Sequence, residues 1–180
     1  MDNGASSYRR FLKGEESAFE EIVGEYRQGL TLFINRYTND MSAAEDIAID
    51  VFTYILLYPG RYNFKTSLKT YLYMLGRSRA LDYIRRRSRL EFLPLEKAES
   101  EAEAPEKIIF DGERKKIVHE AMEKLPKEMS DVLYLIYFEE LSYEETAKIM
   151  KKSKKQIDNL LYRAKEKMRD IIGKEGELLL

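Results

Sequence analysis

Two helix-start signals in the stretch from Leu141 to Met168 constrain the fold of this chain more than any other feature of its sequence. Ser142 is followed three residues later by Glu145, and Ser153 is followed by Gln156 at the same spacing. In such a capping box the serine oxygen accepts a hydrogen bond from a backbone N–H of the first turn, and the Glu or Gln side chain accepts one from the serine N–H. The sequence therefore predicts two helices separated by a tight turn, which is the pattern of a helix-turn-helix.

The second predicted helix has an apolar face and a polar face. Its apolar residues recur at helical spacing and predict a buried side: Ile157, Leu160, Leu161, Ala164 and Met168. Its outward residues can reach phosphates and base edges of DNA: Lys154, Lys155, Gln156, Asp158, Asn159, Tyr162 and Arg163. Two helices of an ordinary bundle, with a charged face in solvent, would show the same pattern. At the turn, Lys151 and Lys152 occupy the positions where a helix-turn-helix usually has a glycine followed by an apolar residue.

The charged side chains are distributed in three blocks. Residues 1–88 carry 13 basic and 11 acidic side chains, residues 89–113 carry 3 and 8, and residues 114–180 carry 15 and 13. The middle block is acidic and has no sustained apolar stripe, so we expect a flexible linker there. Because strand-like alternation bounded by turns is absent, the chain is predicted to be all-α, with two small helical domains joined by that linker.

These blocks give four expected segments. The first domain is placed at residues 1–89 and the linker at residues 90–112. The second domain is placed at residues 113–173, where Gly173 is expected to end the last helix, and residues 174–180 are expected to form a frayed tail. Apolar residues make up 44% of the chain, which is enough to bury a core.

Two long helices are predicted between Ser17 and Tyr58 of the first domain. Capping boxes are expected at their starts, from Ser17 with Glu20 and from Ser42 with Glu45. The first helix has one core stripe: Phe19, Ile22, Val23, Tyr26, Leu30, Phe33 and Tyr37.

The second of these helices, which runs to about Tyr58, is apolar on two sides. One face comprises Ile47, Val51, Ile55 and Tyr58. The other face lies beside Asp46 and Asp50 and comprises Ile49, Phe52 and Leu56. Such a helix is either central in its domain or reserves one side for a partner, and the pattern leaves both possibilities open.

Aromatic and basic side chains are mixed in the segment that follows. Pro59-Gly60 ends the helix, and a loop over residues 61–66 leads into a helix over about residues 67–88. That helix combines tyrosines with arginines: Tyr71, Tyr73, Tyr83, Arg77, Arg79, Arg85, Arg86, Arg87 and Arg89. Aromatic rings stack on unpaired bases and arginine neutralises phosphate, so this mixture suits a single-stranded nucleic acid. A solvated helix whose tyrosines lie in the core is the alternative.

The sequence contains no set of residues typical of an active site. It has one histidine, His119, no cysteine and no phosphate-binding glycine loop, so we expect neither a metal site nor a cofactor. It also lacks a signal-peptide core and any apolar run of membrane length. We therefore expect a cytoplasmic protein that is not an enzyme, has no small-molecule substrate and is not inserted in a membrane.

Taken together, the two halves resemble an RNA polymerase sigma factor of the sigma-70 family, of the extracytoplasmic-function (ECF) type. Residues 16–89 resemble region 2 of that family, through AEDIAIDVF at Ala44–Phe52 and YLYMLGRSRALDYIRRR at Tyr71–Arg87. Residues 114–172 resemble region 4, through LPKEMSDVLYLIYFEELSYEETAKIM and the helix that ends in LLYRAKEKM. The resemblance implies an alternative sigma factor, which binds core RNA polymerase and directs promoter recognition, DNA melting and transcription initiation.

The resemblance also implies roles for particular residues. Contact with the coiled coil of the polymerase's largest subunit falls to Asp46, Ile49, Asp50 and Phe52. Contact with the melted −10 element, including capture of a flipped base by the loop, falls to Arg61, Tyr62, Asn63, Phe64, Lys65, Tyr71, Arg77, Arg79, Arg85 and Arg86. Reading of the −35 element falls to the outward residues of the helix after Ser153, and the apolar side of region 4 would hold the polymerase flap. An anti-sigma factor is a further expected partner.

Some positions depart from the family's usual residues. The family usually has Trp where Tyr71 stands and Gln where Ile49 stands, and many members have basic residues where Asp158 and Leu160 stand. The upstream specificity of another member therefore does not transfer to this chain. A stand-alone helix-turn-helix regulator is the second hypothesis; it would bind DNA as a dimer and would not need the two-faced helix or the Arg–Tyr helix. A protein-interaction adaptor is the third.

Overall fold

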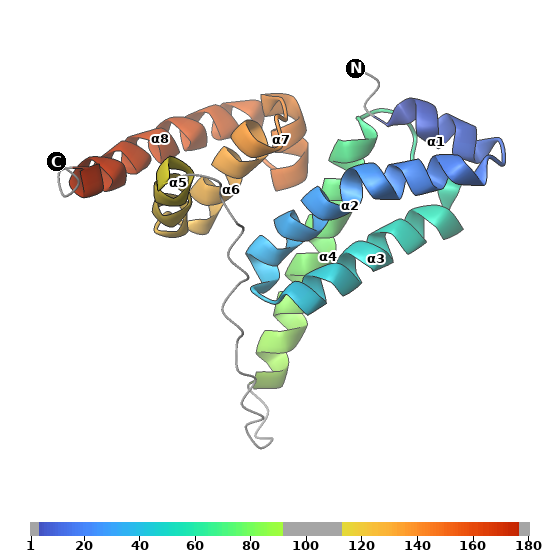
Figure 1. Ribbon diagram of the computed structural model, residues 1–180, viewed down its shortest axis with the longest axis horizontal. Helices are drawn as coiled ribbons and strands as arrows, with labels where there is room; N and C mark the ends of the chain where they lie inside the picture. Colours follow the sequence, from blue (N-terminus) through green and yellow to red (C-terminus); the bar gives the residue numbers. More distant parts are fainter. Residues whose placement is uncertain (1–3, 92–112, 177–180) are drawn as a thin grey trace. The chain divides into compact units, whose positions relative to one another are not determined.

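The computed structural model describes residues 4–91 and 113–176, which form separate compact units on either side of residues 92–112 (Figure 1). Every regular element in the described residues is helical, so the all-α prediction is confirmed. Most of the predicted linker, residues 92–112, and the end of the predicted tail, residues 177–180, lie outside the described residues. Among the described helices, none combines the length and apolar character needed to cross a membrane.

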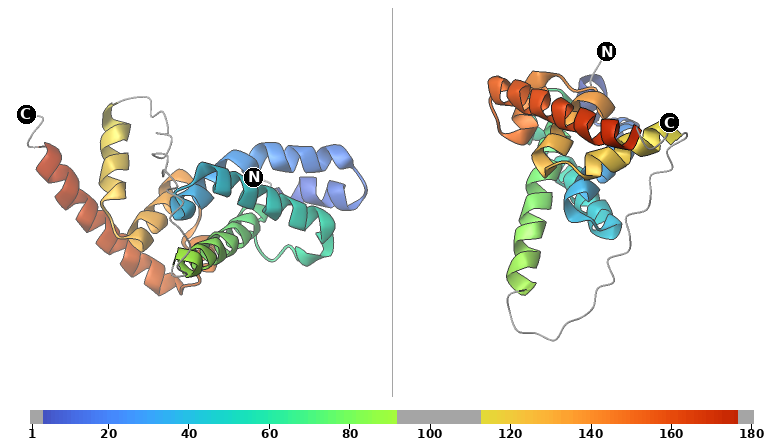
Figure 2. Two further views of the ribbon diagram at one scale, coloured as in Figure 1. Left: turned by 90° about the horizontal axis from the view of Figure 1, so that it is seen from below. Right: turned by 90° about the vertical axis from the view of Figure 1, so that its left-hand side faces the viewer.

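The first unit is built from helices α1 (Ala5–Leu12), α2 (Glu16–Thr38), α3 (Met41–Leu57) and α4 (Leu68–Glu91), with a short 3₁₀ turn η1 (Pro59–Arg61). Helices α2, α3 and α4 pack against one another, and α1 lies along α2 (Figures 1 and 2). Most of the predicted stripe on α2 is buried between them, as Ile22, Leu30 and Phe33 have no exposed surface. This stripe is the core of the unit.

The predicted caps of α2 and α3 are wrong. Helix α3 begins at Met41, because the carboxylate of Asp40 accepts from the backbone N–H of Ala43 at 3.0 Å and caps the helix ahead of Ser42. Helix α2 begins at Glu16, with Glu15 at its N-cap and no side-chain capping bond. Ser17 therefore lies inside the first turn of α2 and does not cap it.

Helix α4 packs its glycine, Gly76, against side chains of α2. Gly76 of α4 is buried, and a Cβ atom at this position would lie 2.9 Å from Cδ1 of Leu30. One turn earlier, the ring of Tyr73 stacks on Phe33 with 4.9 Å between the centroids. A larger residue at position 76 would push the ends of the Leu30 and Ile34 side chains aside, so glycine favours this packing of α4 against α2.

The second unit comprises α5 (Glu113–Glu123), α6 (Lys127–Leu133), a π-helical turn η2 (Tyr134–Phe138), α7 (Tyr143–Met150) and α8 (Lys154–Gly176). Helix α8 packs against α5, α6 and α7. The π turn has no counterpart in the prediction. Gly173 does not end α8, which continues to Gly176, because Gly173 does not adopt the left-handed conformation of a C-terminal glycine.

Both predicted capping boxes in this unit are confirmed. The Ser142 hydroxyl accepts from the Glu145 N–H at 3.3 Å, and the Glu145 carboxylate accepts from the Ser142 N–H at 3.0 Å. At α8 the Ser153 hydroxyl accepts from the Gln156 N–H at 3.2 Å, and the Gln156 side chain accepts from the Ser153 N–H at 2.7 Å. These bonds satisfy backbone groups at the starts of α7 and α8 and delimit the helix-turn-helix.

The turn between α7 and α8 forms without a glycine. Lys151 adopts the left-handed conformation, with φ at 54°, and the N–H of Lys152 donates to the carbonyl of Ala147 at 2.9 Å. The ammonium of Lys152 pairs with Glu128 of α6 at 2.9 Å. The second lysine thus ties the turn to the neighbouring helix, whereas the first holds a conformation that costs a side-chain-bearing residue free energy.

Replacing Lys151 with glycine should raise the free energy of unfolding of the second unit by about 0.5–1 kcal/mol, because glycine has no Cβ to crowd the left-handed backbone. Thermal or urea unfolding followed by circular dichroism measures the change. Lys148→Gly, on the exposed side of α7, is the matched control and should lower stability by about 1 kcal/mol. A Lys151→Gly variant no more stable than the parent chain would contradict this account of the turn.

Candidate functional surfaces

A shallow apolar groove of about 220 Å³ lies between α2 and α3. It is lined by residues of both helices: Phe19, Val23, Arg27, Ile49, Phe52, Thr53 and Leu56. The side chains of Ile49 and Leu56 are 53% and 46% exposed, whereas Phe52 is 6% exposed. The second apolar face of α3 is therefore open to solvent at its rim and closed at its base.

This geometry refines the roles expected on α3. Asp46 and Asp50 are exposed, as a contact with a partner requires. Phe52 is buried and forms the floor of the groove, so a partner can touch only its edge. Tyr58 was expected on the core face but is 53% exposed, because α3 ends at Leu57 and the chain leaves the helical path there.

The loop after α3 does not expose all of its aromatic residues. Tyr62 is 4% exposed, and its hydroxyl donates to the carbonyl of Thr66 at 2.7 Å across the loop. Its ring centroid lies 4.6 Å from that of Phe64 and 5.2 Å from that of Tyr71. We therefore correct the expectation for Tyr62: its ring is enclosed by neighbours and supports the loop, and it is not available to stack on a base.

Phe64 is the aromatic residue that the loop presents to solvent. It is 36% exposed and has a φ of 59°, which is unusual for a bulky residue. Arg61, Asn63 and Lys65 are also exposed, and the Asn63 side chain accepts from the Lys65 N–H at 3.1 Å. The loop thus exposes one aromatic ring and, before and after it in the sequence, the cations of Arg61 and Lys65.

The tyrosines of α4 differ in their exposure to solvent. Tyr73 is 1% exposed and belongs to the core, whereas Tyr71 is half-buried, and burial raises the pKa of its hydroxyl.

The arginines of α4 lie partly against tyrosines and partly in solvent. The Arg79 guanidinium lies 4.9 Å from the centroid of Tyr54, and Arg77 donates to the Tyr37 hydroxyl at 3.3 Å. Further along, Arg86 is exposed, and so is Arg85, which pairs with Asp82 at 3.0 Å. The alternative of tyrosines in the core is therefore confirmed for Tyr73, whereas contact of this helix with a single-stranded nucleic acid stays a prediction.

All seven polar residues expected to face outward at the start of α8 are exposed. Three of them already have partners within the chain. Gln156 caps its own helix, Lys154 pairs with Glu144 at 3.1 Å, and the Tyr162 hydroxyl donates to Glu166 at 2.9 Å. Because the carbonyl oxygen of Gln156 is held in the capping box, only its NH₂ group remains for a base edge, and contact of this residue with DNA stays a prediction. Leu160, which the sequence placed on the apolar side of this helix, is half-buried.

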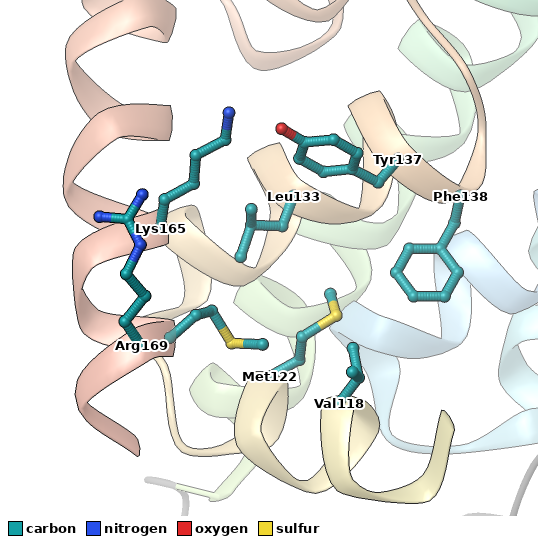
Figure 3. A pocket seen from close by; sticks show the side chains of 8 residues that line it. Val118, Met122, Leu133, Tyr137, Phe138, Lys165 and Arg169 are labelled. Atoms are coloured by element: carbon teal, nitrogen blue, oxygen red, sulfur yellow. The ribbon is translucent and has the colours of Figure 1, made fainter. Parts of the chain in front are cut away.

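A second apolar hollow, of about 400 Å³, lies on the second unit (Figure 3). Its lining comes from α5, α6, η2 and α8: Val118, Met122, Leu133, Tyr137, Phe138, Lys165, Met168 and Arg169. Tyr137 is 53% exposed and Phe138 is 47% exposed, and the Lys165 ammonium lies 5.3 Å from the Tyr137 centroid. The sequence predicted an apolar side here but not these residues. The signal was the unbroken apolar run at residues 132–138, which is too long for one face of a helix.

Comparison with known protein families finds a matching family region in each of the two units. Residues 22–90 match the family model for sigma-70 region 2, and residues 115–168 match the model for sigma-70 region 4. The two models describe successive regions of one kind of protein, and they occur here in the same order.

The chain belongs to the sigma-70 family.

The chain is similar to known sigma factors over nearly their whole length. The chain is 26% identical to the RNA polymerase sigma-H factor of Pseudomonas aeruginosa over 168 residues, covering 87% of each chain. It is 26% identical to the sigma factor YlaC of Bacillus subtilis over 164 residues, covering 89% of this chain and 95% of YlaC. A solved structure of the sigma factor RpoE from Bartonella quintana, in complex with the anti-sigma factor NepR, has the same fold, with a TM-score of 0.69 at 18% identity and coverage of 86% and 96%.

These matches confirm the assignment made from the sequence. The protein is an alternative sigma factor of the ECF type, which binds core RNA polymerase and directs it to promoters. The family is one of transcription initiation factors, and a stand-alone helix-turn-helix regulator is not favoured.

Proposed function

We propose that this sigma factor binds core RNA polymerase and promoter DNA through two different kinds of surface. The apolar groove on region 2 and the apolar hollow on region 4 bind core RNA polymerase, and the basic surfaces of the loop, α4 and α8 bind promoter DNA. The observation that carries this proposal is that exposed large apolar side chains line two hollows that are far apart in the sequence: Ile49 and Leu56 in one, and Tyr137 and Phe138 in the other. Such side chains in a soluble chain mark interaction sites.

The groove between α2 and α3 suits a basic helical partner. Its apolar lining can bury an aliphatic side chain, and the carboxylates of Asp46 and Asp50 stand on the same helix as Ile49. An apolar centre with charged residues around it is the usual arrangement of a strong contact, because the charges set orientation while the centre supplies affinity. The occupant we propose is the coiled coil of the polymerase's largest subunit.

The loop over residues 61–66 and the arginines of α4 suit the melted −10 strand. Phe64 offers a ring for an unpaired base, and Arg61 and Lys65 offer charge for the phosphates beside it. Tyr71, Arg77, Arg79, Arg85 and Arg86 continue this surface along α4. Tyr62 supports the loop from within.

The start of α8 suits the major groove at the −35 element. A helix N-terminus attracts phosphate, and Lys155 adds a positive charge there. Asn159 lies one turn further on, where its amide can pair with adenine, and Arg163 lies a turn beyond that and can reach guanine or a phosphate. Asp158 would repel phosphate, so it points to a cytosine amine or away from the DNA.

The hollow on region 4 suits an apolar segment such as the polymerase flap. Its floor is aliphatic and its rim is aromatic, with the cations of Lys165 and Arg169 on one side (Figure 3). An anti-sigma factor, of the kind bound to RpoE in its solved structure, would act by covering surfaces of this type.

The remaining expectations are part of the same proposal. We assign residues 1–89 to region 2, residues 90–112 to a linker and residues 113–173 to region 4. The protein acts in the cytoplasm, where core polymerase is found, and has no catalytic activity of its own.

The direct test is to mix the purified chain with core RNA polymerase from its own cell and to supply sheared genomic DNA. Co-elution with core, together with initiation at a defined set of start sites that core alone does not use, is the expected result. A dimer that binds duplex DNA by itself and leaves core polymerase unchanged would overturn the proposal.

Reversing the charge of Asp50 should weaken binding to core polymerase by on the order of 2 kcal/mol, because an arginine there would face the basic coiled coil. Competition with labelled parent protein for core measures the loss, and circular dichroism checks that helix content is unchanged. Glu25→Arg makes the same charge change at an exposed position of α2 outside the groove and should compete normally. Equal losses of affinity for core polymerase in the two variants would mean that the net charge of the protein, and not a contact at the groove, determines binding.

Alanine at Phe64 should slow open-complex formation while leaving the initial closed complex intact, because stacking on one base is worth roughly 1–3 kcal/mol. Rapid mixing with a promoter fragment that carries a fluorescent base in the −10 element separates the two stages. Tyr62→Ala is the contrasting variant: it removes a buried ring, so the thermal stability of region 2 should fall together with both stages. A Phe64→Ala variant that loses both stages equally would count against base capture.

Two substitutions on α8 should have different effects. Asn159→Ala should cost roughly 1–3 kcal/mol at the best upstream sequence only, relaxing preference at one position. Lys155→Ala should weaken all upstream sequences alike and reduce the salt slope by about one unit. Binding of the holoenzyme to a panel of −35 variants at several salt concentrations makes the distinction. Uniform weakening by Asn159→Ala would mean that the recognition helix lies differently on the DNA.

A further inference from the structure

The first helix, α1, holds the loop that follows α3. Tyr8 has no exposed surface, and its hydroxyl donates to the carbonyl of Pro59 at 3.0 Å, with the carbonyl of Ile55 3.4 Å away. Burial raises the pKa of this hydroxyl to about 12, so at neutral pH it remains a proton donor. One side chain of α1 therefore fixes the point at which the chain leaves α3 and enters the loop.

The ring of Tyr8 also supports the aromatic residues of the loop. It meets Tyr62 edge-on with 5.0 Å between centroids, and Phe64 edge-on at 6.0 Å. The next residue, Arg9, is exposed, and its guanidinium carbon lies 5.0 Å from the centroid of Phe64. Helix α1 thus contributes both a buried support and an exposed cation to the surroundings of Phe64.

Helix α1 is itself firmly placed against α2. Gly4, which precedes it, has a φ of 75°, and a Cβ atom there would lie 2.7 Å from the Tyr26 hydroxyl, so only glycine fits. Arg10 forms ion pairs with Glu15 and, at 2.8 Å, with Glu21. A displacement of α1 would move Tyr8 and Arg9 relative to the loop, and these contacts oppose such a displacement.

The loop needs such support because of the conformation of Phe64. A bulky residue with a φ of 59° is strained, and such a conformation persists only where the surroundings determine it. The neighbours that define the position of the ring are Tyr62, Tyr8 and Arg9, and two of the three come from α1. Without α1, the Phe64 ring would lose its contacts with Tyr8 and Arg9.

We propose that α1 is part of the site for melted promoter DNA: Tyr8 is a positioning residue that presets the loop to receive an unpaired base on Phe64, and Arg9 binds the phosphate of that nucleotide. This inference rests on the function proposed above and adds to it two residues that the sequence gave no reason to choose. Presetting the loop matters because a ring already in place costs no ordering free energy when the base arrives.

The test uses full-length protein assembled with core polymerase and the promoter fragment on which the parent holoenzyme initiates most strongly. Each variant meets that fragment as a duplex and as a heteroduplex whose −10 element is already unpaired. Tyr8→Phe keeps the ring and removes only the hydroxyl. Arg9→Ala removes the cation, and Lys13→Ala, an exposed lysine at the end of α1, is its matched control.

Tyr8→Phe should slow melting of the duplex and weaken binding to the heteroduplex by about threefold to tenfold, the usual effect of losing one hydrogen bond. Its affinity for core polymerase and for an isolated −35 duplex should be unchanged, a pattern that a general folding defect would not give. Arg9→Ala should reduce the salt slope of heteroduplex binding by about 0.7, and Lys13→Ala should leave it unchanged.

Parent-like melting and heteroduplex binding by Tyr8→Phe would overturn the inference, as would a proportionate loss of core and −35 binding. A parent holoenzyme that initiates nowhere would mean instead that the proposed function is wrong, and the inference would fall with it.

Discussion

The close approach of α4 to α2 at Gly76 is the contact on which the first unit depends. With only a hydrogen atom at that position, the aliphatic end of Leu30 can lie against the backbone of α4, and the rings of Phe33 and Tyr73 can stack one turn away. Glycine at this position thus favours the packing of α4 against α2. Arg77 and Arg79 flank the buried side of α4, next to Tyr37 and Tyr54, so the same contact determines where the basic surface lies.

Within each unit, different faces are apolar and basic. In the first, the groove between α2 and α3 exposes Ile49 and Leu56, while the loop exposes Phe64 and two cations. In the second, the hollow beside Tyr137 is apolar, while the start of α8 is polar. A sigma factor must bind the polymerase and still present DNA-binding surfaces. The proposed division of surfaces predicts that assembly with core polymerase does not use the residues that later bind the promoter.

The sequence predicted features that depend on short-range chemistry and missed those that depend on packing. The capping boxes at Ser142 and Ser153 follow from residues three apart and were found. The cap at Asp40 was missed because Ser42 offered a similar signal nearby. Burial of Tyr62 depends on Tyr8, and no spacing rule joins residues so far apart in the chain. The π turn, which no residue spacing predicted, carries Tyr137 and Phe138 of the region 4 hollow, and the hollow's other residues come from helices that only the packing brings together.

The central claim, that apolar surfaces meet polymerase and aromatic–basic surfaces meet DNA, can be tested by hydroxyl-radical footprinting read by mass spectrometry. The reporter side chains are exposed in the free protein: Ile49, Leu56, Phe64, Tyr137, Phe138 and Tyr162. On adding core polymerase, Ile49, Leu56, Tyr137 and Phe138 should become protected, and Phe64 and Tyr162 should stay reactive until promoter DNA is supplied. Protection of Phe64 and Tyr162 by core alone, with Ile49 and Leu56 still reactive after DNA is added, would contradict the account.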